Sequence, residues 1–232
     1  MTSTFWWILA CILAGGAACY WLLVLTEGTF LGPRVVVWLY DLTAHQYDAI
    51  KKSQFIYEAR HIGIPLVQAL GERGAWRLLD VASGTGRVPL AILAASSDHS
   101  MIWGIDRSAK MLALAQRATS EYGDRMAVSH QEAAQLAFAD KSFEGVACLE
   151  ALEFMPHPRQ VLKEMVRVLK PGGVMLLSNR VGRDAWFFPG RMCGRGPLEN
   201  ELHRLGLENI RMERWQEHYD LVWATNPASR PG

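Results

Sequence analysis

Apolar and polar positions form three successive patterns along the chain of 232 residues. Residues 5–25 form an apolar run without a charge. Residues 29–70 mix aromatic, aliphatic and charged positions, and the remainder alternates short aliphatic or β-branched runs with helical periodicity. Such alternation is typical of βαβ units around a parallel sheet. We therefore expect a membrane anchor over residues 1–28, interfacial helices that lead into the domain over residues 29–70, and one α/β domain over residues 71–232.

The apolar run has the length of a single membrane span. As a helix, residues 5–25 extend about 30 Å, the thickness of the hydrocarbon core of a bilayer, and aromatic residues stand at both ends of the run. A cleaved signal peptide would carry a basic residue before a shorter apolar core, and residues 1–4 carry none. Basic residues follow the run, beginning with Arg34. We expect residues 5–25 to contact membrane lipid in a single-pass protein whose main domain lies in the cytoplasm.

The rest of the chain predicts seven strands separated by helices. Strands are expected at residues 76–82, 101–106, 126–131, 143–151, 174–179, 208–215 and 218–225. Helices are expected at residues 41–60, from Val88 onward, from a Ser108 cap to Tyr122, and at residues 158–169 and 197–205.

Charge and cysteine content exclude several classes of protein. The 24 basic and 23 acidic side chains give a formal net charge of +1, so the chain has no basic excess with which to bind nucleic acid. None of the four cysteines belongs to a CxxC pair, and therefore we expect neither a disulfide framework nor a metal site.

A glycine-rich turn between a strand and a helix is the strongest sign of a ligand site. Gly84 and Gly86 follow the strand that contains Asp80, and Asp106 ends the next strand. Glycines let the backbone bend sharply and let a ligand approach closely. A carboxylate such as that of Asp106 can accept hydrogen bonds from both hydroxyls of a ribose. The turn and the two acids together indicate a nucleotide-type ligand.

Two nucleotide-type ligands compete for this turn. A dinucleotide needs its pyrophosphate at the helix N-terminus and a third glycine that packs helix against strand. Here Pro89 takes the third position, and the Asp80 carboxylate at the mouth of the turn would repel a pyrophosphate. The same carboxylate suits a ligand with a cationic amino-acid end, which favours S-adenosylmethionine.

Several motifs resemble those of class I S-adenosylmethionine-dependent methyltransferases. Residues 80–86, DVASGTG, are similar to the first motif of that family, and GID ending at Asp106 is similar to the second. The segment 162–173, LKEMVRVLKPGG, closely resembles the ubiquinone/menaquinone-biosynthesis-like (methyltransferase type 11) subgroup. QEAAQLAF at residues 131–138 resembles a further motif of that subgroup, with alanine in place of proline at position 137. Tyr40-Asp41 with Ala44 and Tyr47-Asp48 resembles its opening helix, and the whole resemblance covers about residues 40–226.

The resemblance implies a fold and a set of site residues. The expected fold is a doubly wound, Rossmann-like, mostly parallel seven-stranded sheet with a C-terminal antiparallel strand. The implied cofactor is S-adenosyl-L-methionine. By position, the implied cofactor-binding residues are Asp80, Ala82, Ser83, Gly84, Thr85, Gly86, Asp106, Arg107, Glu132, Ala133, Cys148 and Leu149.

The acceptor side of the site is less defined. Glu150 and Glu153 are candidates to orient a nucleophile or take its proton, and each is equally consistent with a capping or surface carboxylate. The aromatic segment 184–196 either covers an apolar substrate or packs near the anchor. We expect a methyltransferase for a small lipophilic acceptor such as a quinone precursor, a phospholipid headgroup or a hydrophobic alcohol or thiol. The alternatives are a membrane-bound binding or scaffold protein that lacks turnover and, disfavoured by Asp80 and Pro89, a nicotinamide-dependent oxidoreductase.

Overall fold

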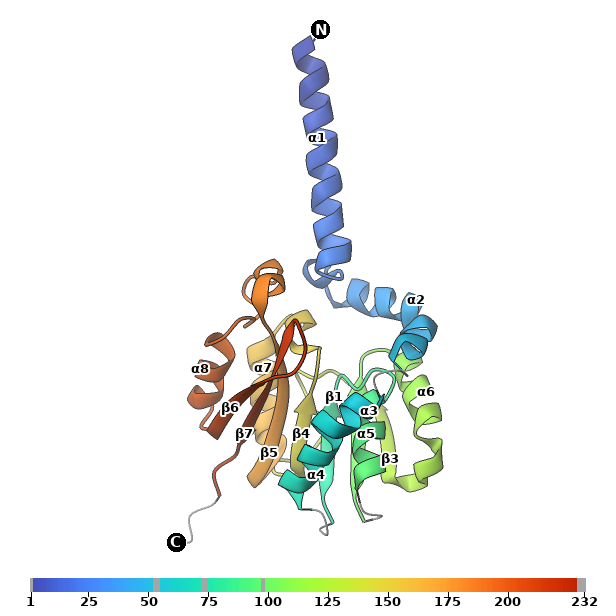
Figure 1. The fold of residues 1–232 in the computed structure, drawn as a ribbon, viewed down its shortest axis with the longest axis vertical. Coiled ribbons are helices and arrows are strands. Elements are labelled where there is room, and N and C mark those ends of the chain that lie inside the picture. The colour runs from blue at the N-terminus through green and yellow to red at the C-terminus, as the bar shows by residue number, and fades with distance from the viewer. Residues whose placement is uncertain (1, 52–54, 72–74, 97–98, 229–232) are drawn as a thin grey trace.

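The computed structural model describes residues 2–51, 55–71, 75–96 and 99–228, without the side chains of residues 2, 45–51, 55 and 56. The motif residues Tyr47 and Asp48 therefore lie outside the described side chains. Figure 1 shows a rod-like N-terminal helix that projects from an α/β domain, with a further helix, α2, crosswise at its foot.

A seven-stranded sheet forms the centre of the domain in the order β3-β2-β1-β4-β5-β7-β6. All pairings from β3 to β5 are parallel, and β7 runs antiparallel to both of its neighbours. The fold prediction, including the C-terminal antiparallel strand, is confirmed. The strands are β1 (Arg77–Val81), β2 (Met101–Asp106), β3 (Met126–His130), β4 (Phe143–Cys148), β5 (Leu169–Arg180), β6 (Glu208–Arg214) and β7 (Tyr219–Thr225).

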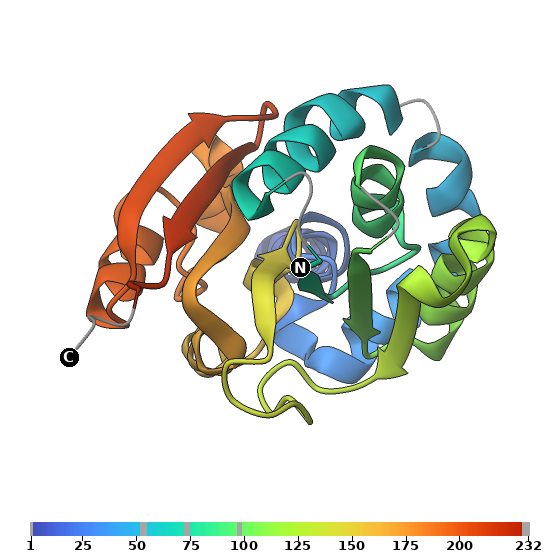
Figure 2. The same cartoon turned by 90° about the horizontal axis from the view of Figure 1, so that it is seen from below.

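Helices cover both faces of the sheet (Figure 2). The side chains of α4 (Ile64–Leu70) and α5 (Arg87–Ala95) pack on one face, and those of α7 (Pro158–Val168) and α8 (Pro197–Arg204) pack on the other. A parallel strand with both faces covered is apolar on both sides, which explains runs such as Leu78-Leu79. The remaining α-helices of the domain are α3 (Phe55–Glu58) and α6 (Ala109–Ala118).

Short helical turns complete the described chain. The 3₁₀ turns are η2 (Thr29–Leu31), η5 (Ser120–Arg125), η6 (Leu152–Phe154) and η7 (Gly182–Phe187), and the π-helical turns are η1 (Trp21–Leu25) and η4 (Ala59–Gly63).

The N-terminal segment forms one long apolar helix. It consists of α1 (Thr2–Tyr20) and η1, and over Ser3–Leu25 it is long and apolar enough to cross a membrane. Phe5, Trp6 and Trp7 are all more than 60% exposed. Each exposed apolar side chain forgoes the free energy of burial, so a helix of this kind is typical of a segment that contacts lipid or a protein partner.

A sharp bend separates this helix from α2 (Pro33–Lys51). Gly28 and Gly32 adopt φ values of 73° and 100°, which only glycine adopts readily. Pro33 then occupies the first position of α2, where its missing N–H costs nothing. We predicted interfacial helices over residues 29–70 and gave one of them the bounds 41–60, whereas the structure begins this helix at residue 33. The N-terminal helix has already ended at Leu25, and Pro33 begins a new helix.

Several predicted boundaries also move, and β5 begins at Leu169 where we predicted a strand from residue 174. The strand expected at 143–151 ends at Cys148, because Glu150 takes a left-handed backbone conformation with φ 51° that no strand accommodates. The helix expected to reach Tyr122 ends at Ala118. Its predicted cap is confirmed, since Oγ of Ser108 accepts a hydrogen bond from the Met111 N–H at 3.0 Å.

Candidate functional site

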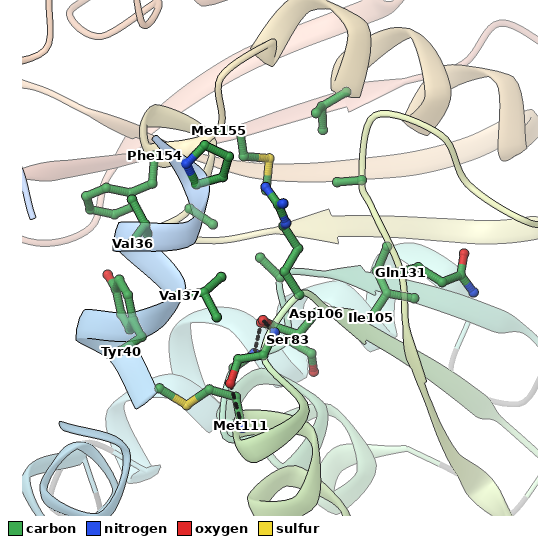
Figure 3. Close-up of a pocket in the computed structure, with 18 of the residues that line it drawn as sticks. Val36, Val37, Tyr40, Ser83, Ile105, Asp106, Met111, Gln131, Phe154 and Met155 are labelled. Atoms are coloured by element: carbon green, nitrogen blue, oxygen red, sulfur yellow. Dashed lines mark hydrogen bonds between the residues drawn. The ribbon is translucent and has the colours of Figure 1, made fainter. Parts of the chain in front are cut away.

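A pocket lies at the carboxyl ends of β1, β2 and β4 (Figure 3). The strand order reverses between β1 and β4, and in open α/β sheets such a reversal leaves a crevice in which ligands bind. The wall below comes from the glycine-rich turn and the ends of these strands. The roof comes from α2 with its Val36, Val37 and Tyr40, and the Tyr40 ring packs edge to face on the Phe154 ring at 6.1 Å.

The glycine-rich turn opens onto this pocket. Ala82 and Gly84 have φ values of 60° and 54°, and a Cβ added to Gly84 would meet no atom within 4 Å. The space above Gly84 is therefore open to a ligand. Gly86 serves a different purpose, because a Cβ there would lie 2.9 Å from Cα of Ala115. Its bare backbone lets α5 approach α6 closely, and it does not line the pocket.

Asp80 is a buried carboxylate that faces the pocket with an unsatisfied atom. Its side chain is 2% exposed, and Oδ2 has no hydrogen-bond partner among the residues that the structure describes. Burial raises the pKa of Asp80 to about 7, while the neighbouring Ser83 hydroxyl lowers this pKa and the Asp106 carboxylate raises it. A buried acceptor without a partner is costly. An ammonium group in the pocket would satisfy it.

Asp106 connects the turn to the end of β2. Its Oδ2 accepts from the Gly84 N–H at 2.9 Å, and its Oδ1 accepts from the Ser108 N–H at 2.8 Å. Burial raises the pKa of Asp106, and these two N–H groups oppose the rise. Each carboxylate oxygen keeps a second lone pair. The carboxylate thus holds the turn in place and can still accept from a pair of hydroxyls in the pocket.

The outer rim beside Asp106 carries an ion pair. Arg107 Nη2 lies 2.7 Å from Glu132 Oε1, and both side chains are partly exposed. Arg107, Glu132 and the neighbouring Ala133 all line the pocket, as predicted from the motifs. The Asp106 carbonyl accepts from the Gln131 N–H at 3.2 Å, which fixes this rim to β2.

The acceptor side of the pocket is apolar. Its roof residues Pro33, Val36, Val37 and Tyr40 follow the spacing of one helical face. The tyrosine hydroxyl donates to Glu27 Oε2 at 2.8 Å. Our prediction of the site missed this roof. The signal was the apolar spacing itself, which we assigned to interfacial helices.

Glu150 lines the pocket as part of an ion-pair network. Its Oε1 accepts from Arg87 Nη2 at 2.8 Å and from Gln216 Nε2 at 3.1 Å. Arg87 also pairs with the fully buried Glu58 at 2.6 Å. The Glu150 carboxylate is thus already engaged by a guanidinium and an amide donor. The arrangement favours a role for Glu150 in shaping the wall over one in proton transfer.

Besides Gly86, two further predicted residues lie outside the cavity. Cys148 is fully buried in the core between the sheet and α7, where burial raises the pKa of its thiol well above the usual value. Glu153 is 2% exposed and accepts from Tyr219 Oη at 2.5 Å and from Arg180 Nε at 2.9 Å. The structure therefore places Glu153 in a buried structural pair and gives no support to its catalytic assignment.

The aromatic segment 184–196 packs near the foot of α1 and does not line the pocket. The Arg191 guanidinium lies 5.4 Å from the centre of the Phe30 ring and donates to the Met155 carbonyl. Of the two expectations for this segment, the position near the anchor is the one that the structure favours.

Comparison with known proteins assigns the centre of this fold. Residues 79–177 match the family model described as a methyltransferase domain. This range holds the turn, Asp106, the rim ion pair and Glu150. Fold, site and family model together identify it as a methyltransferase domain of the S-adenosylmethionine-dependent class.

The curated relatives come from quinone biosynthesis. A ubiquinone/menaquinone biosynthesis C-methyltransferase, UbiE, of Geotalea daltonii is 39% identical over 103 residues, which cover 44% of this chain and 44% of the relative. A demethylmenaquinone methyltransferase of Bacillus licheniformis is 39% identical over 95 residues, which cover 41% and 40%. The chain thus matches less than half the length of these relatives.

Solved structures share the fold at low sequence identity. A SAM-dependent methyltransferase from Aquifex aeolicus has a TM-score of 0.59 and 18% identity, with 69% of this chain and 87% of that chain covered. The [4+2]-cyclase SpnF has a TM-score of 0.61 and 23% identity, with 71% and 82% covered. The fold alone therefore does not define the reaction.

Proposed function

We propose that this protein is a membrane-anchored S-adenosylmethionine-dependent methyltransferase that acts on a small lipophilic acceptor. The pocket itself carries the proposal, because it is polar and acidic at one end and apolar at the other. Asp80 and Asp106 lie at the first end, and Val36, Val37 and Phe154 lie at the second. A charged nucleoside donor and an apolar acceptor match these two ends.

The residues present fit the donor. The unsatisfied Oδ2 of Asp80 suits the ammonium of its methionine end, the space above Gly84 leaves room for its chain, and Asp106 suits its ribose hydroxyls. Arg107, Glu132 and Ala133 would then border the adenine. The bound donor supplies an activated methyl group. The side chains of Leu149 and Met155 also line the cavity and would hold an acceptor in line with it.

No dedicated base is required by this arrangement. Methyl transfer from an activated donor depends mainly on in-line approach, and the pocket carboxylate Glu150 is already paired with Arg87. An apolar enclosure around the acceptor excludes water from the reacting atoms. The protein would thus act chiefly by orienting two bound molecules.

The anchor supports a lipophilic acceptor. Helix α1 with η1 has the length of one span and lies outside the domain. The roof helix α2 follows it after one bend, so that the apolar end of the pocket lies near the foot of the span. The relatives named for quinone biosynthesis make a prenylated quinone precursor one candidate acceptor. The basic residues after the span favour a cytoplasmic domain.

Two measurements test this proposal. Calorimetry on the purified full chain should show binding of S-adenosylmethionine and no binding of NAD. A carbonate wash of membranes should leave the protein in the pellet, because apolar burial is insensitive to ionic conditions. A protein that binds the donor but washes off would keep the methyltransferase assignment and lose the anchor. A chain that remains in the pellet but binds no donor would instead be a membrane-bound binding protein.

A further inference from the structure

We propose that the domain docks on the bilayer through a second surface, in addition to the span, and that this places the acceptor end of the pocket against lipid. The surface, termed the docking face, consists of the exposed apolar residues Leu31, Trp38, Leu42 and Trp186 with the exposed basic residues Arg34 and Arg183. The inference rests on the proposed anchor, because the face flanks the foot of α1.

The first part of the docking face is the outer side of α2. This helix carries two apolar stripes, and the inner stripe lines the pocket through Val36, Val37 and Tyr40. On the outer side, Trp38 is 57% exposed and Leu42 is 59% exposed. Helix α2 lies crosswise to α1 (Figure 1), so it would lie in the plane of the membrane surface if α1 crosses the membrane. An apolar stripe in that plane meets the acyl boundary.

The second part is the η7 turn, which reaches the foot of α1 from the opposite side. Figure 1 shows this turn in orange at the same end of the domain as α2. Trp186 at its tip is 82% exposed, whereas Phe188 just behind it is 1% exposed. A buried ring thus fixes the turn while a second ring projects outward. Tryptophan is the residue most suited to a bilayer interface, since its ring is apolar and its N–H seeks water.

Arg191 follows the η7 turn and contacts the η2 turn that precedes α2. Its guanidinium stacks over the Phe30 ring, which is itself stacked on Trp21 at 5.1 Å. Arg191 also donates to the carbonyl of Met155, a residue of the pocket lining. One side chain therefore links the end of the span with the rim of the pocket. The next lining residues, Pro156 and His157, are exposed.

The position of the docking face beside the span indicates a lipid surface as its occupant. The span fixes the height of the bilayer, and the exposed aromatic and aliphatic side chains lie where its boundary would fall. Arg34 and Arg183 lie beside them in chain positions that meet phosphate headgroups. An acceptor dissolved in the bilayer would then reach the apolar end of the pocket near Met155 without crossing water.

Quenching of tryptophan fluorescence by brominated lipid tests this arrangement directly. The full chain is reconstituted into vesicles of dibrominated phosphatidylcholine with phosphatidylglycerol, and into matched vesicles without bromine. Four single variants are compared, W38F, W186F, W7F as a positive control within the span, and W76F as a negative control. Trp76 is 2% exposed and precedes the amino end of β1, which is the end away from the pocket.

The emission lost in each variant is the difference between its fluorescence and that of the unmodified protein, and it reports the replaced tryptophan alone. We expect bromine to quench the emission lost in W38F and in W186F to nearly the same fraction as the emission lost in W7F. The emission lost in W76F should be unquenched. If W7F reports quenching while the emission lost in W38F and W186F is unquenched, the docking face is wrong and the anchor stands. If none of the three is quenched, the anchor itself fails. If the emission lost in W186F is unquenched and the reconstituted protein migrates as a dimer, a second copy occupies the face and the proposal is overturned.

Discussion

The hydroxyl of Ser108 donates a hydrogen bond to Oδ1 of Asp41 at 2.5 Å, across 67 positions of sequence. The same hydroxyl caps α6, and the backbone N–H of Ser108 donates to Asp106. The roof of the pocket is thereby fastened to the loop that holds the carboxylate facing the donor. This tie explains how a helix near the membrane can influence binding at the polar end.

Removal of this tie should weaken both stability and donor binding. S108A loses the cap of α6 and the bond to α2, and should lower the free energy of unfolding by about 1–2 kcal/mol. D41A loses only the hydrogen bond between α2 and Ser108. It should therefore lower the free energy of unfolding by less than S108A does, and it should also lower the affinity for S-adenosylmethionine. Chemical denaturation and calorimetry on both single variants and the double variant measure the coupling. Fully additive effects on binding would contradict a link through this bond.

The Asp80 carboxylate should lower the stability of the empty protein and raise its affinity for S-adenosylmethionine. Its raised pKa of about 7 means that the empty folded protein holds a proton that the unfolded chain releases above its own pKa of 3.8. This group therefore disfavours the folded state increasingly as pH rises from about 4 to 7, and by about 4 kcal/mol at pH 8. D80N should raise the melting temperature at pH 8 and change it little at pH 4.

The same substitution should abolish donor affinity, because an amide cannot compensate an ammonium. In the native protein, affinity for S-adenosylmethionine should fall as pH drops below about 7, where Asp80 becomes protonated. Calorimetry in two buffers of different ionisation enthalpy would detect the proton released on binding at pH 6. Affinity independent of pH between 5.5 and 8 would show that Asp80 does not meet the ammonium.

Asp106 should contribute more to donor binding than the exposed rim. D106A removes the acceptor of two backbone N–H groups and the expected partner of the ribose, and should weaken binding by about 1–3 kcal/mol. E132Q removes only an exposed ion pair with Arg107, whose contribution is about 0–1 kcal/mol. Equal losses of donor affinity in the two variants would show that Asp106 does not bind the ribose.

Glu153 should prove to be structural. E153Q leaves Arg180 buried beside a neutral partner, and removal of one member of a buried pair costs about 3–5 kcal/mol. Denaturation should show this loss, while donor affinity of the folded protein stays unchanged. E150Q is the matched variant, since Glu150 lines the pocket. A larger effect of E153Q than of E150Q on donor affinity would restore a role in the site.

The strands and the donor end of the site could be predicted from the sequence because local patterns determine them. A buried parallel strand is an apolar run, and a turn such as that around Gly84 needs glycine at fixed positions. Strand alternation also contained an unused signal. Neighbouring residues of a strand point to opposite sides. This alternation argues against our prediction that Cys148 and Leu149 both face the pocket, and only Leu149 lines it.

The acceptor end depends on contacts that are distant in sequence. The three-residue spacing of Glu150 and Glu153 does not reveal which carboxylate faces inward. The left-handed backbone at Glu150 and the partners Arg180 and Tyr219, contributed by β5 and β7, decide it. The inner stripe of α2 has the same composition as a stripe that contacts lipid. Only the bend at Gly28 and Gly32 folds that stripe over the pocket.

Transfer of a labelled methyl group tests the central claim most directly. The full chain in liposomes made from a lipid extract of the cells that produce it would be incubated with S-adenosylmethionine labelled in its methyl group, with D106A as the control. We expect label to enter the fraction soluble in organic solvent, several-fold more slowly with D106A. A protein that binds the donor with full affinity and leaves all label in the aqueous fraction would contradict methyl transfer to a lipophilic acceptor.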